Sequence, residues 1–396
     1  MAAYKYLIVG GGMAADAAVR GIRQVDSVSA IGMVSSEPYP PYTRPYLSKG
    51  LWRGKPYERV WRNTPEEGVE FFLGRTITSL DLVNQQAYDD KGSNYTYEKL
   101  LLATGGSPRH LPIDADDIIY FRSLADYEKL KKLSEEKQEF VVIGGGFIGS
   151  EIAAALAMQN CHVTMVFPDD GIGADIFPRS MAIYLNDYYR QKGVDVCQNH
   201  RVTNIEFKDG AIVTLSDQKK GSQMQVKADA VIAGIGIRPE TSLAEKAGLK
   251  IDNGIQVDDY LVTSDPNVYA AGDVASFYYP ALNTRMRVEH EDNALTMGMI
   301  AGKNMAGEHS PYHHLPYFYS DLFDLGYEAV GRLDSQKEMV VDWKEVHQKG
   351  VIYYLSERRV RGVLLWNVWE QVDNARKLIS EPGPFIPQDL LGRIPM

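Results

Sequence analysis

Short apolar runs that end in glycine alternate with helical patterns along most of this 396-residue chain. Residues 140–143, Phe-Val-Val-Ile, form a run of the kind that is buried in a parallel sheet, and glycines follow at 144, 146 and 149. Residues 152–157 then have the alanine-rich composition of a helix. The pattern predicts a strand, a glycine-rich turn and a helix, and the rest of the chain is organised around this unit.

In this G-x-G-x-x-G spacing each glycine has its own physical role. Gly144 makes the tight turn, Gly146 lets backbone approach a pyrophosphate, and Gly149 lets the helix pack closely on the strand. The phosphates then lie at the helix N-terminus, where N–H groups and the helix dipole favour negative charge. A second apolar run, 162–167, leads to Asp169, where a ribose hydroxyl needs an acceptor. That context favours a dinucleotide-binding fold over a glycine-rich turn without a ligand.

The N-terminus repeats this arrangement. The repeat consists of a strand at 6–9, a turn with Gly10, Gly12 and Ala15, a helix at 14–23 and a strand at 28–34. Glu37 follows that strand, again where an adenosine ribose needs an acceptor. Two such folds in one chain usually hold two different dinucleotides. We therefore expect a bound FAD at the N-terminal turn and an exchanging NAD(P)H at the internal one.

Three further apolar runs end in small residues, so that backbone can approach a flat or polyanionic ligand. They lie at 100–106, 230–236 and 268–273, and the last ends in Asp273, for which capping of the next helix is the alternative. Helices are predicted within 114–137, with a solvated charged face, and at 179–192. Strands are predicted within 194–213.

Two segments differ in composition from the rest of the chain, one rich in proline and the other rich in aromatic residues. Residues 40–49 are proline-rich and carry Arg44 and Lys49, which predicts a rigid segment with a helix starting no earlier than its end, or else a solvated surface loop. From about residue 311, aromatic clusters alternate with strand-like runs at 351–355 and 360–366, which predicts a small antiparallel α+β domain.

The fold class predicted from these elements is α/β, with two Rossmann-like dinucleotide-binding domains of the glutathione-reductase type and a small α+β C-terminal domain. The FAD-binding domain is expected to be discontinuous, over 1–112 and 240–310. The NAD-binding domain is expected over 113–239 and the C-terminal domain over 311–396.

Composition narrows the functional classes. The chain is 44% hydrophobic and 24% charged, as in a soluble globular protein, and its net charge of −10 argues against nucleic-acid binding. Cys161 and Cys197 form neither a C-x-x-C pair nor a metal-ligand spacing, so we expect small buried residues and no metal site. No signal peptide or apolar run of about 18 residues is recognisable, which predicts a cytoplasmic enzyme without a membrane span.

Beyond the two glycine-rich turns, several longer motifs carry a resemblance to a known family. They are PYTRPYLSK, LLATGGSPR, AGIGIRP, VYAAGDVA, RVEHEDNA, YSDLFDLGYEAVGRLD and KGVIYYL followed by VLLWNVW. With these motifs the chain resembles the two-dinucleotide-fold flavoproteins, and among them the branch of ferredoxin and rubredoxin reductases and apoptosis-inducing factor. The resemblance runs nearly end to end, and the C-terminal segments look closest to apoptosis-inducing factor.

The resemblance implies the residues of both cofactor sites. The FAD-binding residues would be Gly10, Gly12, Met13, Ala14, Ala15, Ser36, Glu37, Arg44, Lys49, Ile77, Thr104, Gly105, Arg122, Gly272, Asp273, His290, Glu291 and Tyr319. The NAD-binding residues would be Gly144, Gly145, Gly146, Phe147, Ile148, Gly149, Glu151, Asp169, Gly236, Glu289, His290, Tyr319, Glu328 and Asn367.

Four of these residues are implied to act in catalysis. Lys49 and Glu151 match a family ion pair next to flavin N5, which gives a reason for a carboxylate at a helix start. Phe147 would cover the flavin and move to admit nicotinamide. His290 would lie beside the isoalloxazine.

The chain also departs from the family pattern. Tyr319 stands where tryptophan is usual, Ser36 replaces the first of two acids and leaves Glu37, and Asp175 stands where apoptosis-inducing factor has a lysine. The regulatory insertion of that protein is absent, since 338–350 is short. The region that carries redox cysteines in the disulfide-reductase relatives has none here.

The expected function is therefore NADH-dependent reduction of FAD, with electrons leaving to an external acceptor rather than to an internal disulfide. A ferredoxin or rubredoxin is the expected partner, with a quinone or a monodehydroascorbate-type radical as variants. The alternative is a redox-gated binding protein in which a reduced flavin–NAD complex persists, as the likeness to apoptosis-inducing factor implies. A homodimer is compatible with either function.

The predicted nicotinamide is NADH rather than NADPH. Asp169 can accept a hydrogen bond from the ribose 2′-hydroxyl but would repel a 2′-phosphate, and Asp170 follows directly. Arg179 is the nearest basic residue along the chain, beyond Pro178, and the sequence leaves its reach open.

Overall fold

The computed structural model of the chain describes residues 2–396, so Met1, the first residue of the predicted FAD domain, lies outside it. Two compact units emerge, and each is described by itself. Of the described residues, the first unit combines 2–43, Pro56–Ser107 and Arg238–Phe318. The second combines Arg44–Lys55, Pro108–Ile237 and Tyr319–Met396.

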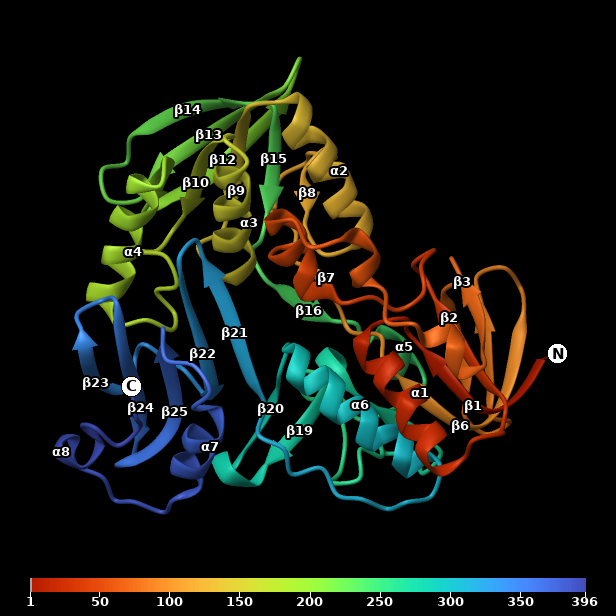
Figure 1. Cartoon of the computed structure of the whole chain (residues 1–396). Helices are drawn as coiled ribbons and strands as arrows, with labels where there is room; N and C mark the ends of the chain where they lie inside the picture. Colours follow the sequence, from red (N-terminus) through yellow and green to blue (C-terminus); the bar gives the residue numbers. More distant parts are fainter. Residues whose placement is uncertain (1) are drawn as a thin grey trace. The chain divides into compact units, whose positions relative to one another are not determined.

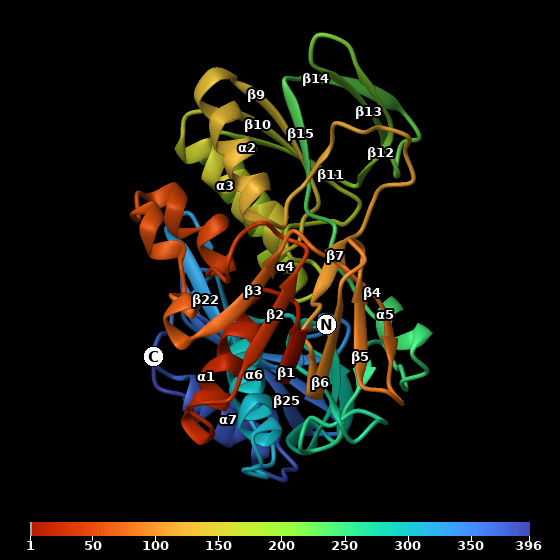
Figure 2. The same ribbon diagram turned by 90° about the vertical axis from the view of Figure 1, so that its right-hand side faces the viewer.

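The first unit is built on a seven-stranded sheet (Figures 1 and 2). Its strands, in spatial order, are β3 (Val69–Leu73), β2 (Ile31–Ser35), β1 (Ala2–Val9), β6 (Asn94–Leu102), β5 (Gln86–Asp89) and β4 (Ile77–Asp81), and β18 (Val268–Ala270) also pairs with β6. The β3, β2, β1, β6 and β18 strands run parallel, whereas β4 and β5 form an antiparallel extension. The parallel part explains the unbroken apolar runs, because such strands are covered on both faces.

Helices α1 (Met13–Val25) and α6 (Glu291–Met305) pack together against this sheet, as Figure 1 shows. Small residues bring them close: a Cβ on Gly302 would lie 2.0 Å from the Ala18 carbonyl oxygen. The buried side chain of Asp16 links α1 to the segment around η4 (Thr64–Glu67), since it accepts hydrogen bonds from Arg62 Nε at 2.7 Å and Thr64 Oγ1 at 2.7 Å. The glycine and alanine content of both helices therefore serves helix–helix contact.

Shorter elements complete the first unit. These are α5 (Ser242–Lys246), the sheet of β17 (Ile255–Gln256), β19 (Ala275–Tyr279) and β20 (Thr284–Arg287), and the 3₁₀ turns η3 (Tyr57–Val60), η4 (Thr64–Glu67), η5 (Gly272–Val274) and η6 (Pro280–Leu282). The chain passes between the units in β7 (Gly106–Pro108) and β16 (Ile237–Pro239).

The second unit contains a five-stranded parallel sheet. In spatial order its strands are β11 (Val194–Gln198), β10 (His162–Phe167), β9 (Glu139–Ile143), β15 (Ala230–Ala233) and β8 (Ile119–Tyr120). The antiparallel strands β12 (His200–Phe207), β13 (Ala211–Asp217) and β14 (Gln223–Ala228) pack on it through a shared core that includes Val141, Val213 and Val231.

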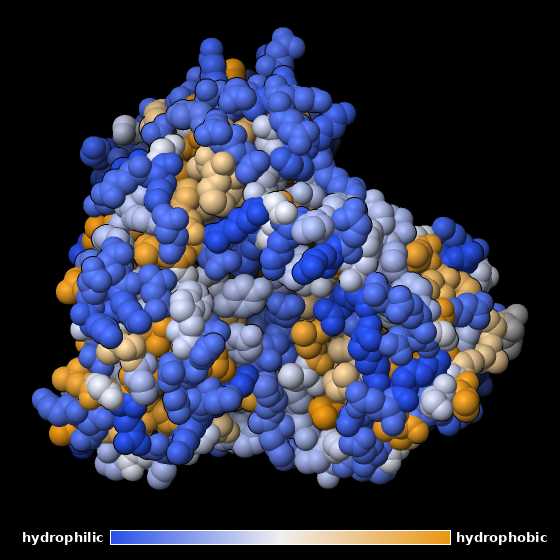
Figure 3. Space-filling view, viewed as in Figure 1, coloured by the Kyte–Doolittle hydropathy of each residue, from blue (hydrophilic) through white to orange (hydrophobic). Residues whose placement is uncertain are grey.

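Five helical elements belong to this part of the second unit. They are α2 (Leu124–Glu136), α3 (Phe147–Met158), α4 (Arg179–Gln191) and the 3₁₀ turns η1 (Arg44–Leu47) and η2 (Gly50–Arg53). Ser123 begins α2 with a capping box to Asp126. The outer face of α2 is hydrophilic, as expected of its charge run (Figure 3).

The C-terminal part of the second unit is a five-stranded antiparallel sheet. Its order is β21 (Tyr317–Leu322), β22 (Leu325–Gly331), β25 (Arg359–Trp366), β24 (Lys349–Ser356) and β23 (Glu338–Glu345), with α7 (Val372–Ser380) and α8 (Pro387–Leu390) following. Trp366 is fully buried, and Phe177 and Tyr327 pack on its ring. Tyr353, Tyr354 and Trp366 therefore belong to the core of this sheet, whereas Trp369 is 48% exposed. The predicted α+β part is confirmed.

The α/β class with two Rossmann-like folds is likewise confirmed, while several predicted boundaries were wrong. The strand predicted at 28–34 begins at Ile31, because Asp26 Oδ1 accepts the N–H groups of Val28 and Ser29 in a turn. The run at 230–236 stops being a strand at Ala233. None of the helices within residues 2–396 is long and apolar enough to cross a membrane.

Candidate functional site

The turn between β1 and α1 has the form of a phosphate cradle. Gly10 has φ +120°, and a Cβ there would lie 2.1 Å from the Ala103 carbonyl oxygen, so only glycine fits. Gly12 precedes α1 without a side-chain cap, and a Cβ on it would meet no atom within 4 Å. The start of α1 therefore has no side-chain cap and has room beside Gly12, as a pyrophosphate site requires.

The turn between β9 and α3 repeats this geometry in the second unit. Gly144 has φ +118°, and a Cβ on Gly149 would lie 2.1 Å from the Gly144 carbonyl oxygen. Gly146 precedes α3 without a side-chain cap, and the space around its Cα is open. Phe147 and Ile148 are 39% and 36% exposed on the first turn of α3. Both turns thus fit a dinucleotide.

Three of the other predicted FAD residues of the first unit follow its parallel strands. Glu37 follows β2 and accepts a hydrogen bond from Tyr42 Oη at 2.5 Å. Thr104 follows β6 and donates to the Glu240 carbonyl at 2.8 Å. Gly272 follows β18 with φ +79°, and a Cβ there would lie 2.9 Å from the Cβ of Ala14 in α1. The close approach to Ala14 places Gly272 beside the cradle of the first turn.

Six more predicted FAD residues of this unit have other surroundings. Ser36 is exposed just after β2, Ile77 is buried at the start of β4, and Gly105 accepts the Glu240 N–H at 3.0 Å. Met13 and Ala15 are buried at the start of α1, and Glu291 begins α6.

His290 caps α6, and its ring stacks on Phe318 with centroids 4.2 Å apart. Burial lowers the pKa of His290 from 6.5 to about 4, although Asp273 and Asp292 oppose the shift. The imidazole is therefore neutral near pH 7. Its neighbour Glu289 is paired with Arg287 at 2.6 Å.

We expect His290 to make the protein less stable in acid. Because its pKa is lower in the folded chain, the unfolded chain takes up the proton first, so the free energy of unfolding falls as the pH drops from 6.5 towards 4. The contribution lost by pH 5 should be about 2 kcal/mol. Urea unfolding of wild type and His290→Asn across this range measures it. Parallel pH dependences for the two proteins would contradict the lowered pKa.

Glu151 is the centre of a buried polar cluster in the second unit. Its carboxylate lies 2.8 Å from Lys49 Nζ and accepts hydrogen bonds from Ser48 Oγ and Ser320 Oγ, both at 2.6 Å. Glu151 is 3% exposed, and Lys49 Nζ also lies 5.1 Å from the ring centroid of Tyr319. A buried carboxylate is tolerated when it is paired and its lone pairs are satisfied, and this one is.

The proline-rich segment supplies the basic half of this cluster. Its 3₁₀ turns η1 and η2 place Lys49 between them, at the N-cap of η2. Arg44, at the start of η1, donates to the Arg122 carbonyl at 3.0 Å. The alternative of a solvated surface loop is therefore wrong, because Glu151 of α3 binds both Ser48 and Lys49 of the segment, and Tyr319 of β21 lies beside Lys49.

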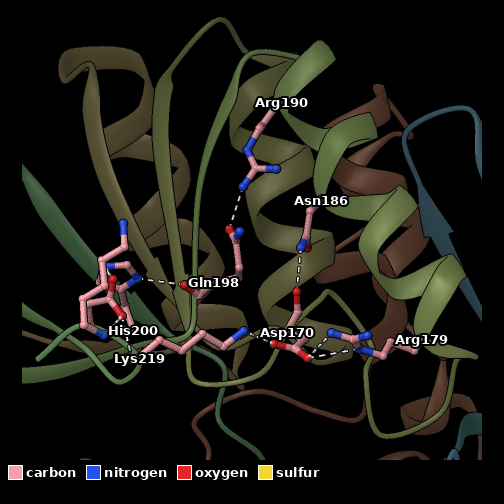
Figure 4. Close-up of polar contacts among 9 residues, drawn as sticks. Asp170, Arg179, Asn186, Arg190, Gln198, His200 and Lys219 are labelled. Carbon is pink, nitrogen blue, oxygen red and sulfur yellow. Dashed lines mark hydrogen bonds and ion pairs between the residues drawn. The ribbon is translucent and has the colours of Figure 1, made fainter.

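Charged groups of both signs meet at the end of β10 (Figure 4). Burial, and then the negative charge of Asp175, raises the pKa of Asp169. Asp170 lies 2.7 Å from Lys219 Nζ and 3.1 Å from an Arg179 nitrogen, and these two cations lower its pKa. Arg179 therefore does reach this corner, which the sequence left open.

Residues from the C-terminal sheet and its neighbours complete the predicted NAD set. Gly236 has φ +94°, and its carbonyl accepts the Arg109 N–H at 2.9 Å. Glu328, in β22, has one buried oxygen without a hydrogen-bond partner, and burial raises its pKa. Asn367 uses its side chain inside the sheet, accepting from Gly326 N–H and donating to the Gln348 carbonyl. Glu328 thus retains an acceptor that a ligand N–H can satisfy.

The two cysteines are free thiols in separate surroundings. Cys161 is buried in the turn after α3, and Cys197 lies half-buried in β11. Burial raises the pKa of both thiols, so neither is an activated nucleophile.

We expect flavin reduction to be independent of thiol chemistry. The double variant Cys161→Ser, Cys197→Ala should retain NADH-driven loss of flavin absorbance at a rate within about twofold of wild type, because neither thiol carries an electron. Anaerobic stopped-flow absorbance measures the rate, and FAD content and far-UV circular dichroism control for folding. Loss of reduction in a folded, FAD-loaded double variant would show that a thiol takes part.

Several partners of the candidate residues escaped the sequence analysis. Ser48 and Ser320 are hydroxyl donors to Glu151, and Lys219 is a partner of Asp170. Ser48 and Ser320 lie inside the quoted motifs PYTRPYLSK and YSDLFDLGYEAVGRLD, each beside a candidate residue, which is the signal that they carried. Lys219 sits in a polar hairpin without any motif.

Comparisons with known proteins bear on the whole chain. Residues 4–298 match the profile of the pyridine nucleotide–disulphide oxidoreductases, and 301–345 and 337–381 match that of the mitochondrion-associated C-terminal part of apoptosis-inducing factor. Monodehydroascorbate reductase 3 of Arabidopsis thaliana is 33% identical over 97% of this chain and 94% of its own length. Mitochondrial apoptosis-inducing factor 1 of Dictyostelium discoideum is 31% identical over 95% of this chain and 78% of its own length.

Among solved structures, the covalent putidaredoxin reductase–putidaredoxin complex contains a chain with a TM-score of 0.88 and 28% identity. The match covers 98% of this chain and 95% of that one. With two dinucleotide cradles on two parallel sheets, the fold and its turns define a flavoprotein that binds two dinucleotides. The chain belongs to the pyridine nucleotide–disulphide oxidoreductase family. It is an NADH-dependent flavoprotein reductase, and its cofactors are FAD and NAD(H).

Proposed function

We propose that this enzyme passes electrons from NADH through FAD to an external carrier, a ferredoxin or a rubredoxin. The observation that carries the proposal is the state of the cysteines, which are unpaired, unactivated and far apart in sequence. Without an internal thiol acceptor, reduced flavin must give its electrons to another molecule. The likeness to a reductase solved in complex with putidaredoxin supports a protein carrier.

Several residues of the second unit have separate roles in the proposed reaction. When both cofactors are bound, nicotinamide supplies a hydride, and flavin accepts it and releases electrons singly. Lys49, held by Glu151, supplies positive charge where reduction makes the flavin negative. Ser48 and Ser320 fix the carboxylate, so that Lys49 keeps one position. Phe147, exposed at the first turn of α3, would cover the flavin face and move to admit nicotinamide.

The proposed domain boundaries follow from the two cofactor sites. We assign 1–112 and 240–310 to FAD, 113–239 to NAD and 311–396 to the C-terminal domain. In this proposal the FAD-binding and NAD-binding residues named from the sequence contact those cofactors, with Glu37 and Asp169 at the two riboses.

A second candidate function is a redox-gated binding protein. The match of 301–345 and 337–381 to the C-terminal part of apoptosis-inducing factor favours it. In that case the reduced flavin–NAD complex reoxidises slowly and alters association with a partner, such as a second copy. A monodehydroascorbate-type radical is another candidate acceptor, and the name of the Arabidopsis relative supports it. A quinone remains a variant of the same reaction.

Reoxidation kinetics separate these candidates. Protein reduced with NADH under anaerobic conditions is mixed with a [2Fe–2S] ferredoxin, a rubredoxin, enzymatically generated monodehydroascorbate, or a short-chain quinone, and the return of flavin absorbance is followed. We expect the iron–sulfur or rubredoxin acceptor to give the fastest reoxidation. Fast reaction only with monodehydroascorbate or quinone would replace the carrier protein by that acceptor. Slow reoxidation by all four, with a change of oligomeric state on reduction, would establish the binding function instead.

A further inference from the structure

Asp170 bridges two cations immediately beside the predicted ribose acceptor. Its Oδ1 lies 2.7 Å from Lys219 Nζ, and its Oδ2 lies 3.2 Å and 3.1 Å from Nε and a terminal nitrogen of Arg179 (Figure 4). The cations come from different elements, since Arg179 begins α4 and Lys219 follows β13. A single carboxylate thus joins a helix start to a hairpin turn.

The backbone around Asp170 is held firmly, so this arrangement is a fixed feature of the corner. Asn186 Nδ2 donates to the Asp170 carbonyl at 2.8 Å, and its Oδ1 accepts the Ile172 N–H at 3.1 Å. The Asp169 carbonyl accepts from Asn199 N–H at 3.0 Å, and the Asn199 carbonyl accepts from the backbone of the hairpin that carries Lys219. The hairpin therefore stays next to β10 without help from the Asp170 side chain.

Stability alone does not explain the bridge. The side chains of Asp170, Arg179 and Lys219 are 37%, 75% and 61% exposed, and ion pairs this open contribute little to folding. The position of Asp170 beside Asp169 suggests another role for the bridge, because Asp169 is where the adenosine ribose of a bound nucleotide would be held. Two cations that reach an exposed carboxylate here can equally reach a phosphate attached to that ribose.

We propose that Asp170 acts as an internal substitute for a ribose 2′-phosphate and is a specificity-determining residue of this enzyme. It occupies Arg179 and Lys219, which without it form a phosphate site beside Asp169. With Asp170 in place, two carboxylates balance the two cations, and a dianionic 2′-phosphate gains no net attraction. The proposal rests on the proposed nicotinamide-nucleotide site at β10.

Replacing Asp170 with Asn should expose this latent site. The variant keeps the shape of the side chain and the backbone contacts of Asn186, but it frees both cations. We expect the affinity for adenosine 2′,5′-bisphosphate, relative to that for 5′-AMP, to rise about tenfold, the size expected of two solvent-exposed charge pairs together. The two probes differ only in the 2′-phosphate, so their ratio removes any general change in the fold. Raising the salt concentration should shrink the gain.

Isothermal titration of the FAD-loaded full chain with these two probes measures the ratio directly, without turnover. Asp170→Glu keeps the negative charge and is the matched control. Its ratio of bisphosphate affinity to 5′-AMP affinity should equal that of the wild type. Adding Arg179→Gln and Lys219→Gln to Asp170→Asn should return the ratio to the wild-type value.

The outcomes separate this proposal from the one on which it rests. If Asp170→Asn binds 5′-AMP as wild type does but shows no gain for the bisphosphate, Asp170 does not mask the cations, and the nucleotide site stands. A gain that survives the removal of both cations would also overturn the proposal. If neither probe nor NADH binds the wild-type protein, the nucleotide site itself is wrong, and both proposals fail.

Discussion

Replacing Glu151 with Ala is expected to slow reduction of the flavin by NADH by on the order of a hundredfold. The change leaves Lys49 near the buried site without its partner, and truncating one member of a buried pair costs about 3–5 kcal/mol of unfolding free energy. Lys49→Ala should slow reduction comparably, because in this account the ion pair acts as one unit. Anaerobic stopped-flow absorbance at saturating NADH gives the rate constants.

The double variant decides whether the two residues act together. Since Glu151 works by holding Lys49, removing both should cost less than the product of the single effects. Ser320→Ala is the matched control: it removes one neutral hydrogen bond to Glu151 but keeps the ion pair, so its rate should stay within about fivefold of wild type. Strictly multiplicative effects of the two single changes would mean that the Lys49–Glu151 contact has no part in the reaction.

The second large effect concerns the choice of nicotinamide nucleotide. We expect NADH to be preferred over NADPH by at least about tenfold in the rate constant for flavin reduction at low nucleotide concentration. In the proposed site Asp169 would accept from the ribose hydroxyl, and a 2′-phosphate would face its charge while Asp170 is paired with the nearby cations. Combining Asp169→Ala with Asp170→Arg should narrow or reverse the preference.

A pH series supplies an internal control for this prediction. Since burial raises the pKa of Asp169, its charge is lost at a higher pH than that of an ordinary carboxyl group, and the preference for NADH should weaken as the pH falls. Asp169→Asn should lack this part of the pH dependence, although the 2′-phosphate itself also titrates. Equal rates with NADH and NADPH in the wild type would remove Asp169 from the ribose site.

The two dinucleotide folds were predictable because local rules determine them. Only glycine fits the backbone at Gly10 and Gly144, and a run such as 140–143 is apolar because sheet and helix cover both its faces. The aromatic residues after 311 likewise predicted a hydrophobic core. The sequence did not indicate that Trp366 would be one of the fully buried residues in it.

The surroundings of the candidate site were less predictable because they depend on packing between distant segments. Ser320 lies 169 residues from Glu151, and Lys219 lies 49 residues from Asp170. No spacing rule connects such pairs, since their contact follows from how one sheet packs on the next. The Lys49–Glu151 pair was predicted only through resemblance, and its 2.8 Å contact is what the structure adds.

The central claim, flavin reduction by NADH without an internal thiol acceptor, is tested most directly by an anaerobic titration of the purified, FAD-loaded protein with NADH. One molecule of NADH delivers two electrons, which is the full capacity of one flavin. The account predicts that flavin absorbance is lost completely at about one NADH per FAD, and equally so after alkylation of any accessible thiols. An end point near two NADH per FAD would reveal a second, thiol-based acceptor, and absorbance unchanged by excess NADH would refute the function itself.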